Sequence, residues 1–256
     1  MTRFAVVYLL MGTFAGAAAA SAPQTPPTPA TPATLATQAP AGGGVELYHV
    51  HFVKAAPGKL VELIDAYVNA PPDPQSPTPP VILRHREGDD WNLLVIAPLG
   101  TESTVRVAAP SAELQQFLTR TRGMRAMHND TFAIGPPWTE ARKLMLGDER
   151  PEASAAGGIY VVSVFRALPG HRDQLEGVLR KMAAEDAGKT VVLQHLEGAP
   201  WEFVMVTRYE SWTAFGESEQ KLGGQAPGPA TLSMGEHLAE HHDTIAERIT
   251  RAAPAR

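Results

Sequence analysis

The chain has 256 residues, of which 44% are hydrophobic and 19% are charged. This length suits one large domain or two of ordinary size, and the hydrophobic content is sufficient to bury a core. The net charge is −5 and no basic block occurs, which argues against nucleic acid as a partner. Cysteine is absent, so disulfides, thiolate metal sites and cysteine nucleophiles are excluded.

Residues 1–22 have the pattern of a secretory signal peptide. Arg3 supplies a positive charge, an apolar run extends over Phe4–Phe14, and residues 20–22 read Ala-Ser-Ala, a typical cleavage pattern. The apolar stretch is barely long enough to span a membrane and its second half is Ala and Gly, so cleavage is favoured over retention as an anchor. We therefore expect an exported protein, periplasmic or extracellular, without membrane contact after cleavage.

Residues 23–44 are rich in proline, threonine and alanine and carry no charge. They show no hydrophobic period, which indicates an extended, solvated linker rather than a folded element. The folded part is expected to begin near residue 45.

The rest of the chain contains one sequence unit twice. The matching blocks are residues 47–58 with 159–170, 81–96 with 191–206, and 128–131 with 241–244. The offsets between the copies are 112, 110 and 113 residues. Three blocks in the same order at nearly one offset indicate a tandem duplication. We place the first repeat at 45–150 and the second at 151–256.

The elements of one repeat follow from its periodicity. In chain order they are a strand at 47–53, a helix at 59–70, strands at 81–86 and 91–97 joined by a Gly-Asp hairpin turn, and a helix at 111–128. Ser111 is placed to cap the last helix. The final segment, 131–134, and its counterpart, 244–249, fit a strand or a helix. The order β-α-β-β-α-(β) is that of a ferredoxin-like unit.

Three features give the chain a resemblance to the dimeric α/β-barrel superfamily. They are a Pro-Gly pair before the first helix, the H-x-E-G-x-x-W hairpin at 85–91 and 195–201, and the late H-x-D-T. The superfamily includes antibiotic-biosynthesis-monooxygenase-like, EthD-like and stress-responsive barrel families. The resemblance implies an α+β fold, in which two tandem ferredoxin-like βαββαβ units pack as an intrachain pseudo-dimeric α/β barrel around a cavity.

The resemblance leaves the activity open. The superfamily includes cofactor-free oxygenases, haem-binding and haem-degrading enzymes, isomerases and members without known activity. No catalytic set from these families maps onto this sequence residue by residue. A monomer with pseudo-dimeric halves is the expected state.

Four histidines are candidate catalytic bases: His49, His51, His85 and His195. The last two lie in the repeated hairpins, where hydrogen bonding to the turn is the competing interpretation. The first two are two residues apart on one strand and share a face, whereas the second repeat has Val and Ser there. They could bind a divalent transition metal with His85 as a third ligand, although hydrogen-bonded sheet histidines are more ordinary.

The faces of the first strand suggest where these histidines point. Tyr48, Val50 and Phe52 form the uniformly apolar set, which we expect to pack under the helices. The face that carries His49 and His51 would then look into the space between the two sheets.

The hairpins also supply candidate ligand-binding residues. Trp91 and Trp201 are large enough to wall a cavity or stack on an aromatic ligand, with core packing as the alternative. Arg86, Asn92 and Glu202 lie opposite or beside the hairpin residues and complete this polar and aromatic set.

Two further histidine patterns occur late in the repeats. Residues 237–241 read H-x-x-E-H, the pattern of inverted zinc proteases on a helix, but the first repeat lacks the pair and we treat the match as coincidental. The H-x-D pattern at 128–130 and 241–243 fits a dyad in which Asp orients His, or an element boundary at which Asp satisfies backbone donors.

The favoured function is an exported protein that binds a small apolar or aromatic molecule between its halves, with cofactor-free oxygenase or isomerase chemistry as the finer form. The alternatives are a haem- or metal-binding protein and a non-catalytic envelope or stress-response module. In the favoured case no cofactor is needed, and the partner is a small molecule rather than nucleic acid or a membrane.

The signal-peptide pattern can be tested directly. We expect the mature N-terminus to be Pro23, because small residues precede it at the two positions that signal peptidase reads. Intact-mass measurement of protein from the envelope fraction checks this. A membrane-bound species that still carries Met1 would instead show an anchor.

Overall fold

The computed structural model describes residues 44–76, 78–101, 104, 109–147, 158–186, 189–197, 199–223 and 229–250. The expected signal peptide and almost all of the expected linker lie outside the described residues. All of the described residues belong to one unit of the chain, Ala39–Arg256.

The elements follow the order expected for two ferredoxin-like repeats. In chain order they are β1 (Glu46–Ala55), α1 (Leu60–Val68), β2 (Val81–Glu87), β3 (Leu93–Gly100), α2 (Ala112–Arg122), β4 (Arg125–Gly135), α3 (Trp138–Leu146), β5 (Ile159–Ala167), α4 (Arg172–Glu185), β6 (Thr190–Glu197), β7 (Phe203–Tyr209), α5 (Trp212–Gly223), α6 (Pro229–Gly235) and β8 (Leu238–Arg248). Helix α3 lies between the repeats, and α6 is an addition to the second.

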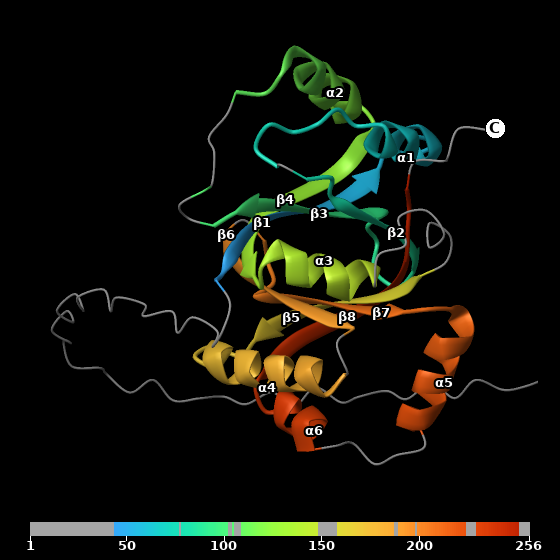
Figure 1. The fold of residues 1–256 in the computed structure, drawn as a ribbon. Coiled ribbons are helices and arrows are strands. Elements are labelled where there is room, and N and C mark those ends of the chain that lie inside the picture. The colour runs from blue at the N-terminus through green and yellow to red at the C-terminus, as the bar shows by residue number, and fades with distance from the viewer. Residues whose placement is uncertain are drawn as a thin grey trace, which may run out of the picture. The chain divides into compact units, whose positions relative to one another are not determined.

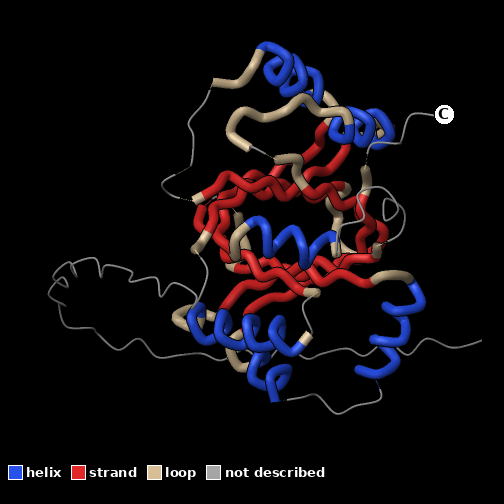
Figure 2. Tube along the Cα trace, viewed as in Figure 1, coloured by secondary structure: helices blue, strands red, loops and turns tan. Residues whose placement is uncertain are grey.

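The strands form a closed antiparallel barrel in the order β1-β3-β2-β8-β5-β7-β6-β4. Each strand of the first repeat stands four places from its counterpart in the second, so a pseudo-two-fold axis along the barrel relates the repeats. Strands of different repeats pair at two seams, β2 with β8 and β4 with β6. Figure 2 shows the strands as a ring with the helices outside it, apart from α3. The expected pseudo-dimeric barrel within one chain is confirmed.

Apolar side chains from both repeats fill the barrel interior. The buried set includes Tyr48, Val50, Phe52, Leu83, Leu94, Ile96, Tyr160, Val162, Leu193, Val204 and Val206. Smaller clusters lie on the outside, where α1 and α2 cover the first half and α4 and α6 cover the second (Figure 1). The barrel therefore has a packed interior rather than a wide internal cavity.

The expected orientation of β1 was wrong. Tyr48, Val50 and Phe52 point into the barrel, whereas Val53, on the opposite face with His49 and His51, packs under α1 and α2. The closed interior accepts only the more uniformly apolar face, because an unpaired polar group there would have no water. The outer face is covered only in part, so it tolerates the histidines.

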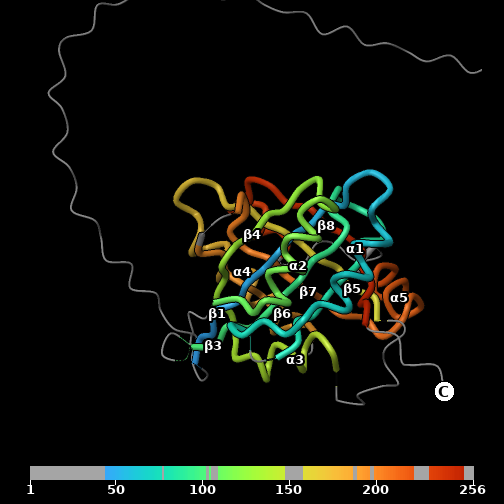
Figure 3. Tube along the Cα trace, turned by 90° about the horizontal axis from the view of Figure 1, so that it is seen from above, coloured from blue at the N-terminus to red at the C-terminus, as the bar shows by residue number. Residues whose placement is uncertain are grey.

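Helix α3 closes one end of the barrel: it lies across the ring of strands in Figure 1 and at one edge of the strands in the turned view of Figure 3. Its Trp138, Ala141 and Met145 are buried in the interior core. Tyr48 donates a hydrogen bond from its hydroxyl to the carbonyl of Pro136, just before the helix. Tyr160, at the matching position of the second repeat, donates to the carbonyl of Met145 at 2.7 Å. Matching tyrosines of the two repeats thus hold the segment that links them.

The last strand of each repeat is longer than expected. Helix α2 has the expected cap, with Ser111 Oγ accepting from the Leu114 N–H at 3.1 Å, but it ends at Arg122 and not at residue 128. Residues from Arg125 onward pair with β1 and form β4. The undecided 244–249 segment belongs largely to β8, which pairs with β5. Long-range pairing outweighs local helix preference in both places.

No helix among the described residues combines the length and the hydrophobicity that a membrane crossing needs.

We expect the α3 closure to contribute strongly to stability. Trp138 and Trp212 each begin a helix, but their exposures are 7% and 51%. Trp138→Ala should lower the free energy of unfolding by about 3–5 kcal/mol, because it removes a buried indole. Trp212→Ala, the matched control, should cost less than about 1 kcal/mol. Urea unfolding measures both, and equal costs would show that α3 is not part of the core.

Candidate functional site

A cavity of about 220 Å³ lies at the barrel end opposite α3. The tyrosines that hold α3 lie early in β1 and β5, whereas the cavity is lined by residues further along the same strands. Its walls come from both repeats and comprise Phe52, Asp89, Asp90, Trp91, Met127, Asn129, Val164, Phe165, Arg166, Pro200, Trp201, Glu240 and His242. This axial cavity is therefore shared between the halves of the chain.

The apolar part of the axial cavity is aromatic. Trp91 and Trp201, which precede β3 and β7, are both buried, and each packs edge-on against Phe52 with ring centroids 5.5 and 6.1 Å away. The structure thus places the two tryptophans in the core and in the cavity wall at once. The Nε1 of Trp201 is buried and has no hydrogen-bond partner among the described residues.

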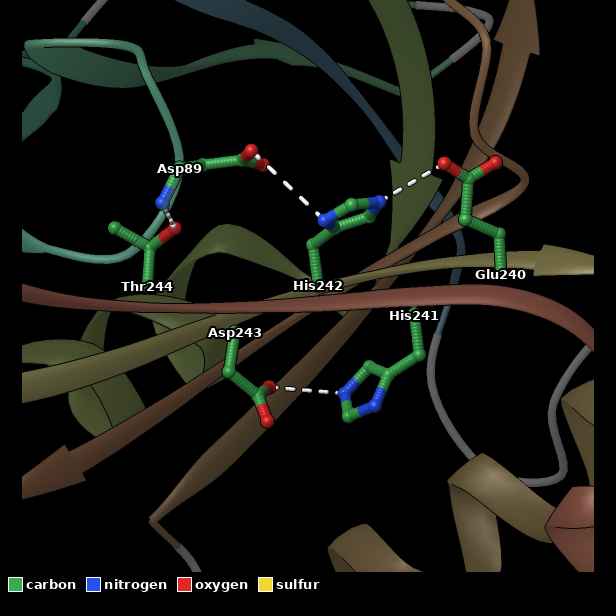
Figure 4. Close-up of polar contacts among 6 residues, drawn as sticks. All are labelled: Asp89, Glu240, His241, His242, Asp243 and Thr244. Atoms are coloured by element: carbon green, nitrogen blue, oxygen red, sulfur yellow. Dashed lines mark hydrogen bonds and ion pairs between the residues drawn. The ribbon is translucent and has the colours of Figure 1, made fainter. Parts of the chain in front are cut away.

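The rim of the axial cavity is charged. His242 Nε2 lies 2.9 Å from Glu240 Oε1, and its Nδ1 lies 3.9 Å from Asp89 Oδ1 (Figure 4). Glu240 also pairs with Arg166 at 2.5 Å. The hydrogen bond to Glu240 is the main reason that the pKa of His242 is raised above its usual 6.5. Asp90 is the third carboxylate of the rim and pairs with Lys54 at 2.5 Å, so each of the three carboxylates has a cationic neighbour or the His242 imidazole beside it.

The two hairpin histidines differ in their partners. His195 Nε2 accepts a hydrogen bond from the Ala199 N–H at 2.9 Å, so it fixes its own hairpin. In the first repeat the corresponding N–H, that of Asp89, instead donates to Thr244 Oγ1 at 3.3 Å. His85 Nε2 is consequently buried without a partner among the described residues, and burial lowers the pKa of His85.

The close approach of the first hairpin to β8 explains this difference. Gly88 has a φ of +124°, and a Cβ there would lie 2.5 Å from the carbonyl oxygen of Asp243. Only glycine at this position permits the hairpin to lie against β8, where Thr244 Oγ1 accepts the hydrogen bond from the Asp89 N–H.

Three of the candidate ligand-binding residues make contacts within the fold. Asn92 Oδ1 accepts from the Ala55 N–H at 2.7 Å, and Glu202 Oε2 accepts from the Ala167 N–H at 2.9 Å. These equivalent contacts satisfy the ends of β1 and β5. Arg86 bonds to Glu247 across the β2–β8 seam at 3.3 Å. None of the three is among the residues that line the axial cavity.

His49 and His51 lie outside the barrel in a cluster with two residues of β4. His51 Nε2 is 2.8 Å from His49 Nδ1, and His51 Nδ1 is 3.0 Å from His128 Nε2. Asp130 pairs with His49 and lies 3.8 Å from His51. His85, expected as a third ligand, is on the opposite face of the sheet, with Val81 and Leu83.

The second repeat has a smaller polar cluster at the equivalent place. His241 Nε2 and Ser163 Oγ bond to Asp243 Oδ1 at 2.9 and 2.5 Å, so here Asp orients His as the dyad interpretation expects. The H-x-x-E-H match falls at the start of strand β8, not on a helix, and His237 contacts His171 at 3.0 Å. The arrangement typical of inverted zinc proteases is absent from this described segment.

The sequence analysis did not predict that His242 and Glu240 line the cavity. It also did not predict the ion pair between Asp130 and His49. The signal that could have found the first pair is the alternation over 238–248: if this segment is a strand, Glu240 and His242 share one face and His241 the other. Figure 4 shows these two faces. The Asp130 contact depends on the register of β1 against β4.

No protein-family model and no curated protein sequence matches the chain. A "putative monooxygenase" from Fusobacterium nucleatum subsp. nucleatum has a similar solved structure, with a TM-score of 0.57 and 8% identity over 81% of this chain and 94% of that chain. An anthrone oxidase-like protein gives 0.53 and 15% over 84% and 98%. A "putative monooxygenase" from Lactobacillus acidophilus NCFM gives 0.51 and 6% over 82% and 98%. These similarities confirm the dimeric α+β-barrel fold that the sequence resemblance implies.

The rim geometry makes an electrostatic prediction. Glu240→Gln should lower the pKa of His242 toward 6.5, because it removes the hydrogen-bonded carboxylate that favours the imidazolium. Asp89→Asn, the matched control, should lower it less, since that carboxylate is 3.9 Å away. NMR titration of the His242 ring checks both, and a larger effect of Asp89→Asn would contradict this assignment.

Proposed function

We propose that the protein binds a small, neutral, largely aromatic molecule in the axial cavity. The observation that carries this proposal is the grouping of two buried tryptophans with Phe52 in the wall of one cavity shared by both repeats. Stacking on indole rings favours a flat aromatic ligand.

The volume and charge of the cavity narrow the ligand class. At about 220 Å³ it lies below the range of roughly 300–1,000 Å³ common for ligand pockets, which favours a compact ring system over a macrocycle such as haem. The cations described at the rim already have carboxylate neighbours, since Lys54 pairs with Asp90, Arg166 with Glu240, and His242 lies beside Asp89 and Glu240. An anionic ligand would therefore lose its hydration without gaining a new ion pair there. A neutral phenol or ketone of two or three fused rings satisfies both constraints, and the name of the anthrone oxidase-like structural neighbour agrees with this class.

The finer proposal is cofactor-free oxygenation or isomerisation that begins with proton transfer. His242 is the group on the cavity rim suited to take a proton from the ligand when its ring is neutral, because Glu240 and Asp89 stabilise the imidazolium that forms. In the oxygenase form, O₂ is the oxidant of the resulting ligand anion; in the isomerase form, His242 returns the proton to another ligand atom. His85 Nε2 is unpartnered in the described structure and its lowered pKa keeps it neutral, but it is not part of the cavity wall. His242 is therefore the proposed proton-transfer residue.

A second candidate function is binding without turnover. The specific observation in its favour is the filled barrel interior, which confines ligand space to the mouth instead of a deep, water-excluded chamber. Under both proposed functions the protein binds the ligand, but only under the first does it convert the ligand to a product. Incubation with a phenolic ligand in air, followed by product analysis, separates them.

Ligand binding can be tested with 2-naphthol as the probe. Calorimetry should show binding of 2-naphthol and weaker or no binding of 2-naphthalenesulfonate, because the sulfonate would lose hydration beside aromatic walls while the rim cations already pair with carboxylates. Trp201→Leu and Trp91→Leu each remove one aromatic wall of the cavity and should weaken 2-naphthol binding about 3–10-fold. Trp212→Leu, at an exposed tryptophan that does not line the cavity, is the control and should leave the affinity unchanged.

Two results would contradict the proposal. One is equal affinity for the neutral and anionic probes, which would place binding away from the aromatic wall. The other is unchanged affinity for 2-naphthol in both folded variants, Trp201→Leu and Trp91→Leu.

A further inference from the structure

The outer-face cluster of His49, His51, His128 and Asp130 lies outside the axial cavity and has no part in the proposed function. Strand β1 brings two histidines to one face, and β4 places Asp130 directly opposite His51 in the register. Residues 79 positions apart in sequence therefore meet through strand pairing alone. We propose that His49, His51 and Asp130 form a binding site for a divalent transition-metal ion of the zinc type.

The positions of the donor atoms fit such an ion. One ligand atom from each of His49, His51 and Asp130 can be chosen so that all three lie within 4.8 Å of one another. Zinc bonds of about 2.0–2.1 Å in tetrahedral geometry separate ligand atoms by roughly 3.3 Å. His51 contacts His49 through its Nε2 at 2.8 Å and faces Asp130 with its Nδ1 at 3.8 Å, so one ion would use one of these nitrogens, and the three ligand atoms would have to draw together from within 4.8 Å. Three protein ligands leave a fourth position for water.

The surroundings leave the cluster both ordered and accessible. Phe132 stacks against His49 with ring centroids 5.3 Å apart, which limits rotation of that ring. The side chains of His51, His49 and Asp130 are 18%, 23% and 44% exposed, so an ion can reach them from solvent. Arg125 lies close enough to lower the pKa of His51, and its repulsion of a cation opposes the attraction of Asp130.

The donor set selects among metal ions. Two imidazoles and one carboxylate suit Zn²⁺, Co²⁺, Ni²⁺ or Cu²⁺, whereas Mg²⁺ prefers oxygen ligands and retains its waters. The second repeat provides an internal comparison, because Val161 and Ser163 replace the two β1 histidines there. The equivalent position of the second repeat, with Val161 and Ser163, should therefore not bind the ion.

The site can be tested on the full chain after chelator treatment and dialysis, with Zn²⁺ as the probe. His49→Val with His51→Ser introduces the residues that the second repeat already has at these positions, so the fold should accept them. The double variant should bind Zn²⁺ at least about 100-fold more weakly than the unaltered protein in a chelator competition assay. Mg²⁺ in excess should not displace the ion.

Two control variants address the other histidine groups. His241→Ala alters the equivalent cluster of the second repeat, and His237→Ala breaks the His171–His237 contact. Both should keep Zn²⁺ affinity within about 2-fold of the unaltered protein if these groups supply no ligand. Asp130→Asn, which changes only a charge on a partly exposed residue, should weaken Zn²⁺ binding at least about 10-fold and serves if the double variant does not fold.

Equal Zn²⁺ affinity in the unaltered protein and in the folded double variant, or in Asp130→Asn, would overturn the proposal. A loss confined to His237→Ala or His241→Ala would also overturn it. Binding of 2-naphthol in the axial cavity should be the same in all these variants, so the outcome does not depend on the proposed ligand function.

Discussion

Pairing between strands of different repeats is the interaction on which the rest of the molecule depends. The β2–β8 and β4–β6 seams close the barrel and leave no sheet edge unpaired. Without them, each repeat would be a four-stranded sheet with one bare apolar face that carries Tyr48, Val50 and Phe52, or their counterparts. Closure buries both faces against each other, which explains why two repeats in one chain can take the place of a dimer.

The segment between the repeats makes the two ends of this symmetric barrel different. Helix α3 inserts Trp138 and Met145 into one end, whereas the other end retains the axial cavity with Trp91 and Trp201. The duplication itself predicts two equivalent halves, each able to contribute to a shared site. The two repeats contribute different side chains to the cavity rim. Strand β4 supplies Met127 and Asn129, whereas β8 supplies Glu240 and His242 at the equivalent positions.

Much of this fold follows from the sequence. The strand and helix order, the Ser111 cap, the hairpins and the pseudo-dimeric barrel rest on local periodicity and on the repeat, and these signals are strong. The strand at residues 125–128 was not foreseeable from local propensity, because it exists only through pairing with β1. Helix α3 has no repeat counterpart to draw attention to it.

The candidate sites depend more on long-range geometry. The faces of β1 were inverted in the sequence interpretation because it treated the barrel interior as a polar space, whereas closure makes it the driest part of the protein. His85 and His195 occupy the same motif but differ in their hydrogen bonds. The Ala199 N–H donates to His195, whereas the corresponding Asp89 N–H donates to Thr244 of β8 and not to His85. The Asp130 cluster follows from register, which the sequence alone does not specify.

One strand can therefore serve two unrelated sites. Period-two alternation sends His242 of β8 to the axial cavity and His241 to the outer face, and it separates Asn129 from Asp130 in the same way on β4. The chemistry at the barrel axis is aromatic with a charged rim, and the chemistry outside the first repeat is that of clustered imidazoles. The backbone of the closed sheet lies between these two environments and separates them.

Backbone amide shift mapping during titration with 2-naphthol tests most directly the claim that closure creates one ligand site on the barrel axis. The account expects shifts to concentrate at residues 52, 89–91, 164–166, 201 and 240–242, with α3 unaffected. Shifts concentrated at α3, or along the outer helices α1, α2 and α4, would contradict it.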